Sequence, residues 1–351
     1  MSRSAAVHLD EEVGIMRSLV WQGPNQLVVQ DSPKPEPGPG EVLIKVAYTG
    51  ICGSDITIYR GFHQRAKPPL IIGHEFVGHV AELGPGVDDR LQVGDMVTAE
   101  PTFSCGTCKY CRSNLSNLCA GVGVRGVDGP GAFAEYFVSK QEKVYKLPPA
   151  MPLREGAVIE PLAVGVHAVN KGQVAIDEDV AVIGAGPIGI LTAQAARARG
   201  AGRVFVIEVK PNRLKLAEKL GFIPIDGRED PVAAVRSMTG GVDVVFDAAG
   251  ALASAGYLVP LVKKGGRLVV VSIFKEAPPM DLRTMAYSEL SLCGCFIYVP
   301  QDFHQAVELA SSDKVDLASV ISHEVPLADA VRGFELMEKA DDSMKVLIKI
   351  S

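Results

Sequence analysis

Short runs of alternating apolar and polar residues make up the first part of the chain, from about residue 16 to residue 150. Turns that contain glycine and proline separate these runs, and the stretch GEVLIKV at 40–46 is a representative one. Strands that recur at such short spacing are typical of a compact β-rich unit. We therefore predict a β-rich domain for this part of the chain.

The pattern changes near residue 165, where short apolar runs begin to alternate with helical stretches such as 212–220. The apolar runs lie at 180–183, 203–207, 242–246 and 267–272. Alternating strands and helices are typical of a parallel sheet with helices on both faces. The sequence thus predicts an α/β protein whose second domain is a doubly wound parallel sheet.

The end of the chain returns to a different texture, with helices expected at 303–310 and 327–339 and a closing strand at 345–350. This segment is too short to form a domain of its own, so we expect it to complete the first one. The predicted units are residues 16–165 with 302–351, residues 166–301, and an N-terminal extension of residues 1–15.

Composition places the chain among folded proteins, because 47% of its 351 residues are hydrophobic and 22% are charged. The net charge is −6 without any basic block, so nucleic acid and anionic membranes are not expected partners. Residues 1–14 lack the apolar core of a secretory signal. The longest uncharged stretch, 180–196, is too short and too rich in glycine for a membrane span. We expect a cytoplasmic protein.

A glycine-rich turn follows the apolar run at 180–183 and opens a helical stretch. It contains Gly184, Gly186, Pro187, Ile188 and Gly189 and fits the pattern G-x-G-x-x-G. The three glycines of this pattern allow a tight turn, a close approach to a pyrophosphate and close packing of helix on strand. The helix N-terminus then attracts the phosphates. A glycine turn without a ligand is the alternative.

Glu208 ends the next predicted strand. A carboxylate at this place accepts hydrogen bonds from the ribose hydroxyls and repels a 2′-phosphate, which favours NAD over NADP. Lys210 and Arg213 follow closely and could hold a phosphate instead. Arg213 is a candidate cofactor-binding residue, although a solvated helix face is an equally good interpretation.

Four of the seven cysteines lie close together, at Cys105, Cys108, Cys111 and Cys119. Four thiolates at this spacing can close a tetrahedral site around zinc without ligands from elsewhere. Such a closed shell leaves no open position, so the predicted role is structural. A disulfide framework is less favoured, because it belongs to small secreted chains.

A second set of metal-ligand residue types is dispersed along the chain and consists of Cys52, His74, Glu75 and Glu160. One thiolate, one imidazole and one or two carboxylates suit a catalytic zinc that keeps a position for water or substrate. Taken alone, the set is weaker evidence, since a single cysteine and a single histidine are more often structural.

Taken in order, these motifs resemble those of the medium-chain zinc-dependent alcohol dehydrogenases. The motifs are GICGSD at 50–55, GHE at 73–75, the four-cysteine segment, IEPLAVGVHA at 159–168 and GAGPIG at 184–189. The resemblance extends from about Met16 to Ser351. Glu160 is similar to the acid of the polyol branch, which includes sorbitol dehydrogenase and 2,3-butanediol dehydrogenase. Ile297 stands where sorbitol enzymes tend to carry an Arg, so long polyols are less expected.

The resemblance implies a GroES-like catalytic domain, a Rossmann domain, NAD and two zinc ions per subunit. Cys52 and His74 would bind the catalytic zinc, and Glu75 and Glu160 would bind it or hold its water. Ser54 would relay the substrate proton. Ile273 and Phe296 complete the predicted cofactor-binding residues. The family's usual histidine is replaced by Thr57, so water or His63 would take the proton onward.

The predicted reaction is the reversible oxidation of a secondary alcohol, diol or polyol to a ketone, with hydride transfer to NAD. The substrate is expected between the domains. Candidate lining residues are Tyr59, Phe62, Phe296 and Tyr298, although ordinary core packing is an equally good interpretation of these aromatic residues. The resemblance also implies a homotetramer, with the predicted strand at 291–299 as a pairing edge.

Three other functions compete with this prediction. They are a zinc-free quinone reductase on the same fold, a non-catalytic NAD(H)- and zinc-binding protein, and a threonine 3-dehydrogenase. The set of Cys52, His74 and Glu75 argues against the first, and Ser54 argues against the second. Residues 100–103 lack the histidine that the third would place there.

Overall fold

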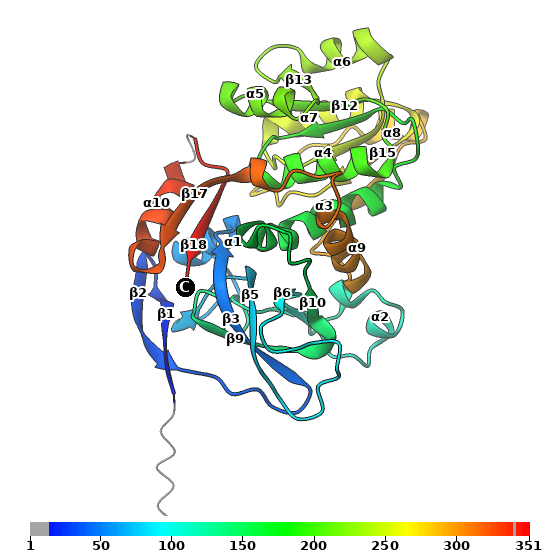
Figure 1. The fold of residues 1–351 in the computed structure, drawn as a ribbon. Helices are drawn as coiled ribbons and strands as arrows, with labels where there is room; N and C mark the ends of the chain where they lie inside the picture. Colours follow the sequence, from blue (N-terminus) through cyan, green and yellow to red (C-terminus); the bar gives the residue numbers. More distant parts are fainter. Residues whose placement is uncertain (1–13, 340–341) are drawn as a thin grey trace, which may run out of the picture.

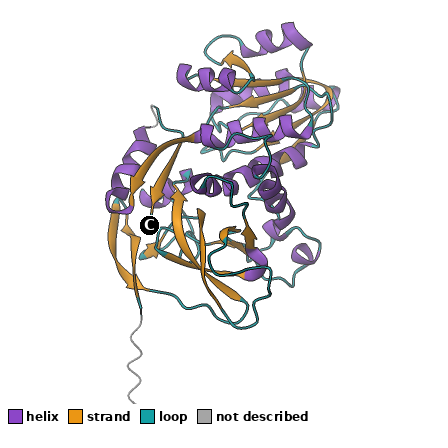
Figure 2. Ribbon diagram, viewed as in Figure 1, coloured by secondary structure: helices purple, strands orange, loops and turns teal. Residues whose placement is uncertain are grey.

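The computed structural model describes residues 14–339 and 342–351 (Figure 1). The predicted N-terminal extension therefore lies almost entirely outside the described residues. Strands dominate the lower body of the molecule, and a sheet flanked by helices forms the upper body (Figure 2). No helix in the described ranges is long and apolar enough to cross a membrane.

The lower body is built on a seven-stranded sheet and a smaller three-stranded one. The seven strands are β10 (Val144–Lys146), β6 (Met96–Ala99), β5 (Glu75–Leu83), β3 (Glu41–Gly50), β18 (Lys345–Lys349) and β17 (Ile321–Pro326), in that order, with β9 (Tyr136–Lys140) also on β3. The three are β2 (Gln26–Pro33), β1 (Ile15–Gly23) and β4 (Leu70–Ile71). The closing strand predicted for the C-terminus is confirmed. It pairs with β3 and so joins the sheet of the N-terminal half.

The upper body contains a six-stranded parallel sheet in the order β13-β12-β11-β14-β15-β16. Its strands are β11 (Val180–Ile183), β12 (Val204–Glu208), β13 (Ile223–Asp226), β14 (Val242–Asp247), β15 (Val262–Val270) and β16 (Ser291–Gly294). This is the strand order of a doubly wound dinucleotide-binding sheet, which confirms the predicted fold. The central strand β11 is buried at every position, because helices cover both faces.

Helices connect the strands of the upper body and pack between the two bodies. The connecting helices are α4 (Pro187–Arg199), α5 (Pro211–Lys219), α6 (Pro231–Thr239), α7 (Leu252–Leu261) and α8 (Leu282–Tyr287). Helices α3 (Ile159–Gly172) and α9 (Pro300–Ala310) pack against each other where the two bodies meet (Figure 1). The predicted helix at 327–339 is a short 3-10 turn, Leu327–Asp329, followed by α10 (Ala330–Lys339).

The strand predicted for 291–299 is shorter than expected. It ends at Gly294, and Ile297 has a φ of 55°, in the left-handed region that a β-branched residue rarely adopts. The apolar pattern predicts a strand over the whole segment, but the buried residue Tyr298 lies beyond the end of β16, where the backbone is irregular. Strand β16 is nevertheless an edge of the parallel sheet, as predicted.

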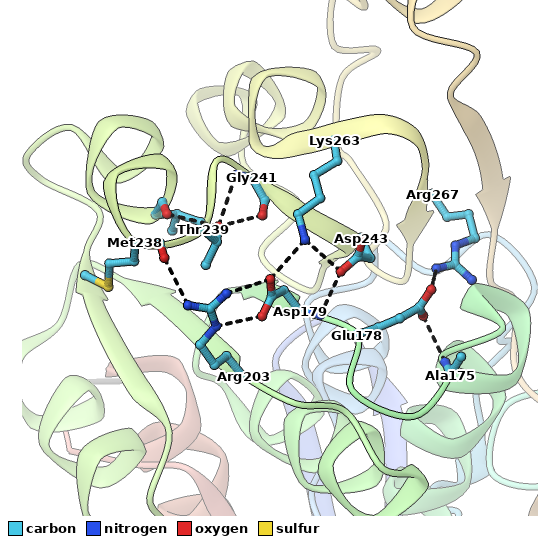
Figure 3. Close-up of polar contacts among 11 residues, drawn as sticks. Ala175, Glu178, Asp179, Arg203, Met238, Thr239, Gly241, Asp243, Lys263 and Arg267 are labelled. Atoms are coloured by element: carbon cyan, nitrogen blue, oxygen red, sulfur yellow. Dashed lines mark hydrogen bonds and ion pairs between the residues drawn. The ribbon is translucent and has the colours of Figure 1, made fainter.

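Ion pairs connect the amino-terminal ends of the parallel strands (Figure 3). Arg203 binds Asp179 through two hydrogen bonds, Nε to Oδ1 at 2.7 Å and Nη2 to Oδ2 at 2.9 Å. The Nζ atom of Lys263 lies 3.0 Å from both Asp179 Oδ2 and Asp243 Oδ2. These residues lie at the starts of β11, β12, β14 and β15. The cluster is at the opposite end of the sheet from the glycine turn, so we assign it to stability.

Replacing Asp179 with Asn should lower the free energy of unfolding by on the order of 1–3 kcal/mol near neutral pH, because two cations lose their shared carboxylate. Burial works to raise the pKa of Asp179, but the hydrogen bonds from Arg203 and Lys263 outweigh it and lower this pKa. A depressed folded-state pKa contributes stability above the unfolded pKa, and this stability is lost as the pH falls. Urea unfolding should therefore show that the difference in free energy of unfolding between wild type and Asp179→Asn becomes smaller from about pH 6 to about pH 3. Asp177→Asn, an exposed neighbour, is the control, and an equal deficit there would refute the assignment.

Candidate active site

The pairing of β3 with β5 brings the first candidate ligands together. Gly50, the last residue of β3, is paired with Glu75, the first residue of β5. Cys52 lies two residues after the end of β3 and is the N-cap of α1 (Gly53–Tyr59), while His74 directly precedes β5. Residues that are distant in the sequence thus meet at one end of the sheet.

The side chains of Cys52, His74 and Glu75 form a tight group. Their ligand-type atoms lie within 4.8 Å of one another, and the residues His74 and Glu75 are 6% and 1% exposed. Ser54, in the first turn of α1, has its Oγ atom 3.5 Å from His74 Nε2. The structure therefore brings four of the predicted site residues together.

Asp55 is a buried carboxylate that supports this group. Its Oδ2 atom accepts the Cys52 backbone N–H at 2.9 Å, and its Oδ1 atom lies 3.7 Å from His74 Nδ1. The imidazole thus turns Nδ1 toward Asp55 and leaves Nε2 for the cluster. A carboxylate behind a ligating histidine fixes the tautomer and the ring orientation.

Glu160, in the first turn of α3, is 8% exposed and does not belong to the group whose ligand-type atoms lie within 4.8 Å, but it interacts electrostatically with His74 and Glu75. Its Oε1 atom accepts a hydrogen bond of 2.9 Å from the Tyr298 hydroxyl. Burial raises the pKa of Glu160 to about 7, and the negative charge of Glu75 also acts in that direction. A bound dication would reverse this effect, since an opposite charge favours the ionised carboxylate.

Lys345, which sequence reasoning missed, contacts Glu75 from strand β18. Its Nζ atom lies 2.7 Å from Oε1 and 2.6 Å from Oε2 of Glu75, and 3.2 Å from the Ile51 carbonyl oxygen. Lys345 is 3% exposed. The sequence offered one signal for this contact, a lysine at the start of the apolar strand at 345–349. A lysine that is buried in such a strand needs an anionic partner.

The cluster fits a zinc ion. Burial lowers the pKa of His74, but the charges of Asp55 and Cys52 outweigh it and hold this pKa well above its usual value. The surroundings therefore favour a positive charge at this place. The donor set of thiolate, imidazole and carboxylate is one that zinc accepts, and zinc binding would displace the protons.

The four-cysteine lobe, residues 105–119, is a separate cluster. It holds α2 (Lys109–Arg112) and a 3-10 turn, Ser116–Leu118, beside a small sheet of β7 (Thr102–Phe103) and β8 (Gly123–Val124). The Sγ–Sγ distances are 3.9 Å for Cys105–Cys111, 3.5 Å for Cys108–Cys111 and 3.5 Å for Cys119–Cys105. Zinc–sulfur bonds of about 2.3 Å in a tetrahedron require about 3.8 Å between sulfurs. The lobe therefore fits a structural zinc.

The thiol of Cys105 already favours the charged form. Hydrogen bonds from the Thr107 and Cys108 backbone lower the pKa of Cys105 to about 6. Because zinc binds thiolates, a lowered pKa helps the lobe to take up the metal near neutral pH.

The glycine turn has the geometry that its pattern predicts. Gly184 has a φ of 94°, and a Cβ on Gly189 would lie 1.8 Å from the Gly184 carbonyl oxygen, so neither position accepts a side chain. Gly186 is the N-cap of α4, with Pro187 and Ile188 in the first turn. A Cβ on Gly186 would meet only the Arg213 guanidinium, at 3.8 Å. The turn is therefore open to a phosphate.

Glu208 and Arg213 face each other beside this turn. Glu208 Oε2 accepts the Ala185 backbone N–H at 2.9 Å, and Arg213 Nη1 lies 3.7 Å from the same oxygen. The Arg213 side chain is only 17% exposed, and its Nη2 donates to the Ser343 carbonyl oxygen at 3.2 Å. Arg213 is thus not on a solvated helix face.

The predicted residues of the cofactor site and the substrate pocket that remain to be described range from exposed to fully buried. Ile273 and Phe296 are 87% and 45% exposed, so both are accessible to a ligand. Tyr298 is 1% exposed and presents no free surface. The other two candidate lining residues also differ: Tyr59 packs edge-on against Phe334, with ring centroids 5.5 Å apart, and Phe62 is 79% exposed.

Thr57 and His63 are the two residues that bear on the predicted path of the proton. Thr57 is exposed and donates to the Gly53 carbonyl oxygen. The Nδ1 atom of His63 accepts the backbone N–H groups of Arg65 and Ala66, at 3.3 and 3.2 Å. Burial lowers the pKa of His63, and the charge of Arg65 adds to this. His63 is therefore neutral at physiological pH, with its Nε2 carrying the hydrogen.

Comparisons with known proteins agree with this arrangement. The family model of the alcohol dehydrogenase GroES-like domain matches residues 38–149, and that of the zinc-binding dehydrogenases matches residues 187–312. The chain is 38% identical to 2-dehydro-3-deoxy-L-galactonate 5-dehydrogenase of Pseudoalteromonas atlantica, over 89% of this chain and 92% of that protein. It is 36% identical to a sorbitol dehydrogenase of Halalkalibacterium halodurans, over 95% and 99% of the two chains.

A solved structure shows the same fold. The 2R,3R-butanediol dehydrogenase of Bacillus subtilis superposes with a TM-score of 0.89 at 30% identity, covering 96% of this chain and all of that one. The chain belongs to the zinc-binding alcohol dehydrogenases, as its motifs predicted. It is a zinc-binding dehydrogenase, and the group of Cys52, His74 and Glu75 is its candidate metal site.

Proposed function

We propose that this enzyme oxidises a secondary hydroxyl of a small diol, polyol or sugar acid to a ketone, with NAD as the hydride acceptor. The observation that carries the proposal is the group of half-buried Cys52 with buried His74 and Glu75, whose ligand-type atoms lie within 4.8 Å of one another. Glu160 and Ser54 stand beside it. The names of the relatives support a polyhydroxylated substrate.

Each residue of the group has a proposed role. Cys52 and His74 would bind the catalytic zinc, and Glu75 and Glu160 would bind it or hold its water. When bound, zinc is a Lewis acid that lowers the pKa of the substrate hydroxyl, and NAD takes the hydride. Ser54 would accept the substrate proton through its Oγ atom, and the distance of 3.5 Å from this atom to His74 Nε2 supports the role. Water carries the proton onward, because the Thr57 hydroxyl donates its hydrogen to the Gly53 carbonyl oxygen and has no basic group to hold a further proton.

The cofactor is held by the glycine turn and by Glu208. The α4 N-terminus, with Gly184, Gly186 and Gly189, binds the pyrophosphate. Glu208 is 8% exposed, and its carboxylate faces the turn through the Ala185 N–H. A buried carboxylate at this place disfavours a 2′-phosphate, which supports NAD over NADP. Arg213, Ile273 and Phe296 complete the proposed cofactor site.

The same proposal includes the organisation of the chain. We assign residues 16–165 and 302–351 to the catalytic domain and residues 166–301 to the dinucleotide domain. The exposed edge strand β16, in which Leu292 is 44% exposed, supports pairing between subunits of a homotetramer. We also propose a cytoplasmic location, because the cytosol keeps thiols reduced and the seven cysteines form no disulfide.

The test is to measure NADH and NADPH formation with butanediols, polyols, inositols, sugar acids, threonine and simple secondary alcohols. We expect NAD-linked turnover of a diol, polyol or sugar acid, abolished by a chelator and restored by added zinc. Turnover that survives zinc removal would contradict the proposal in favour of the zinc-free reductase. Binding of NADH without turnover of any alcohol would favour the non-catalytic protein.

A further inference from the structure

Asn117 connects the four-cysteine lobe with the segment that carries Tyr298. Asn117 lies between Cys111 and Cys119 and is 6% exposed. Its Nδ2 atom donates to the Phe296 carbonyl oxygen at 2.9 Å, a contact between residues 179 positions apart. Binding of a metal by four thiolates does not require a buried amide aimed at another part of the fold.

The orientation of this amide is fixed by its surroundings. Asn117 Oδ1 is buried and has no hydrogen-bond partner among the described residues. Exchanging the two amide atoms would place Oδ1 against the Phe296 carbonyl oxygen, and two acceptors cannot share a hydrogen bond. In this orientation Asn117 Oδ1 remains without a hydrogen bond, while Nδ2 makes its hydrogen bond to the Phe296 carbonyl oxygen.

The segment that receives this hydrogen bond is held on both sides. The Cys295 backbone N–H donates to the Val270 carbonyl oxygen at 2.8 Å, and the Val299 N–H donates to Asp302 Oδ2 at 3.0 Å. Between them Ile297 has a φ of 55°, a conformation that is costly for a β-branched residue. Such a conformation persists only where neighbouring contacts impose it.

Tyr298 follows this strained residue and reaches the active site. Its ring is 1% exposed and packs against Phe303 with centroids 5.6 Å apart. Its hydroxyl donates to Glu160 Oε1 at 2.9 Å. A change in the backbone at Phe296 or Ile297 would therefore move the donor that holds Glu160.

We propose that Asn117 is a positioning residue for the reaction. By holding the Phe296 carbonyl group it keeps Ile297 in its left-handed conformation, and so keeps the Tyr298 hydroxyl on Glu160. The four-cysteine lobe then controls the geometry of the active site as well as the stability of the fold. This inference rests on the proposed function, in which Glu160 lies beside the catalytic zinc.

The test compares Asn117→Leu, which keeps the shape of the side chain, and Asn117→Asp, which sets a carboxylate against the carbonyl oxygen. We expect kcat to fall by about tenfold to a hundredfold in both, because small misplacements of an active-site group are costly. The content of two zinc ions per chain should not change. Ser113→Ala, an exposed position in the same lobe, is the control and should retain the wild-type kcat.

A double-mutant cycle shows whether Asn117 acts through Tyr298. If it does, adding Asn117→Leu to Tyr298→Phe should lower kcat no further than Tyr298→Phe alone. Independent, multiplicative losses would overturn the proposal, and so would an unchanged kcat in both Asn117 variants. If Asn117→Leu does not fold, the cycle is carried out with Asn117→Asp.

A second readout does not depend on turnover. Cobalt(II) in place of the catalytic zinc has a visible absorption spectrum that reports its ligand geometry. We expect Asn117→Leu and Tyr298→Phe to shift this spectrum in the same way, and Ser113→Ala to leave it unchanged. A wild-type protein that oxidises no alcohol would refute the proposed function, whereas identical spectra in all four proteins would refute the role of Asn117.

Discussion

Replacing Cys52 with Ser is expected to abolish alcohol oxidation while leaving NADH binding intact. Cys52 supplies the only sulfur ligand of the group with His74 and Glu75, and a hydroxyl is a much weaker zinc ligand. Losing the metal removes several kcal/mol of stabilisation from the transition state, so kcat should fall by about 1,000-fold or more. Zinc analysis should show that one of the two metal ions is lost.

The matched control for this result is Cys293→Ser. Cys293 is a cysteine of β16 outside both clusters, and its Sγ atom contacts the Lys171 carbonyl oxygen. It should keep both metal ions and the wild-type kcat. The dissociation constant of NADH, followed by fluorescence, should be the same in Cys52→Ser and wild type, since the glycine turn is on the other body. Full turnover by Cys52→Ser would contradict the proposed site.

Replacing Lys345 with Met should destabilise the protein more than any other single change considered. Burial lowers the pKa of Lys345, but the charges of Glu75 and Cys52 outweigh it and raise this pKa, so the residue is a buried cation. Removing it leaves the carboxylate of Glu75 buried without its ion-pair partner, which costs on the order of 3–5 kcal/mol. Chemical unfolding of the metal-free protein should show the loss directly.

Lys349→Met provides the comparison within the same strand. Lys349 is the exposed last residue of β18, and its replacement should change the free energy of unfolding by less than about 0.5 kcal/mol. Excess zinc should recover part of the stability of Lys345→Met, because a dication can neutralise Glu75 in place of the lysine. Equal effects of the two substitutions would show that the ion pair contributes nothing.

Local patterns predicted those parts of the site that lie close together in the sequence. The spacing of Cys105, Cys108, Cys111 and Cys119 was sufficient for one metal site, and the glycine turn was sufficient for the dinucleotide fold. The dispersed set of Cys52, His74, Glu75 and Glu160 was weaker evidence from its residue types, and the resemblance to a family supported it. The sequence does not show that Cys52 and His74 are close, because they meet only when β3 pairs with β5, and Glu160 comes from helix α3.

The contacts that support the site were not predictable in this way. Lys345 meets Glu75 only because β18 returns to β3, and Asn117 meets Phe296 only because the lobe packs on the irregular segment after β16. The sequence made Tyr298 a candidate pocket residue, because the position of a tyrosine in the sequence does not show whether its hydroxyl faces a ligand or a carboxylate. Such long-range contacts depend on the folded topology, which a local pattern does not encode.

The place of β18 between β3 and β17 has a consequence for synthesis on the ribosome. Glu75 and its partner Lys345 are 270 residues apart, so the ion pair cannot form until the C-terminal strand has been made. Chains grow at roughly 5–20 residues per second, so the sheet that contains β3 lacks β18 while the residues of the dinucleotide sheet are being translated. During that time the unpaired edge of β3 is exposed to other chains, and chaperones have their largest opportunity to act there.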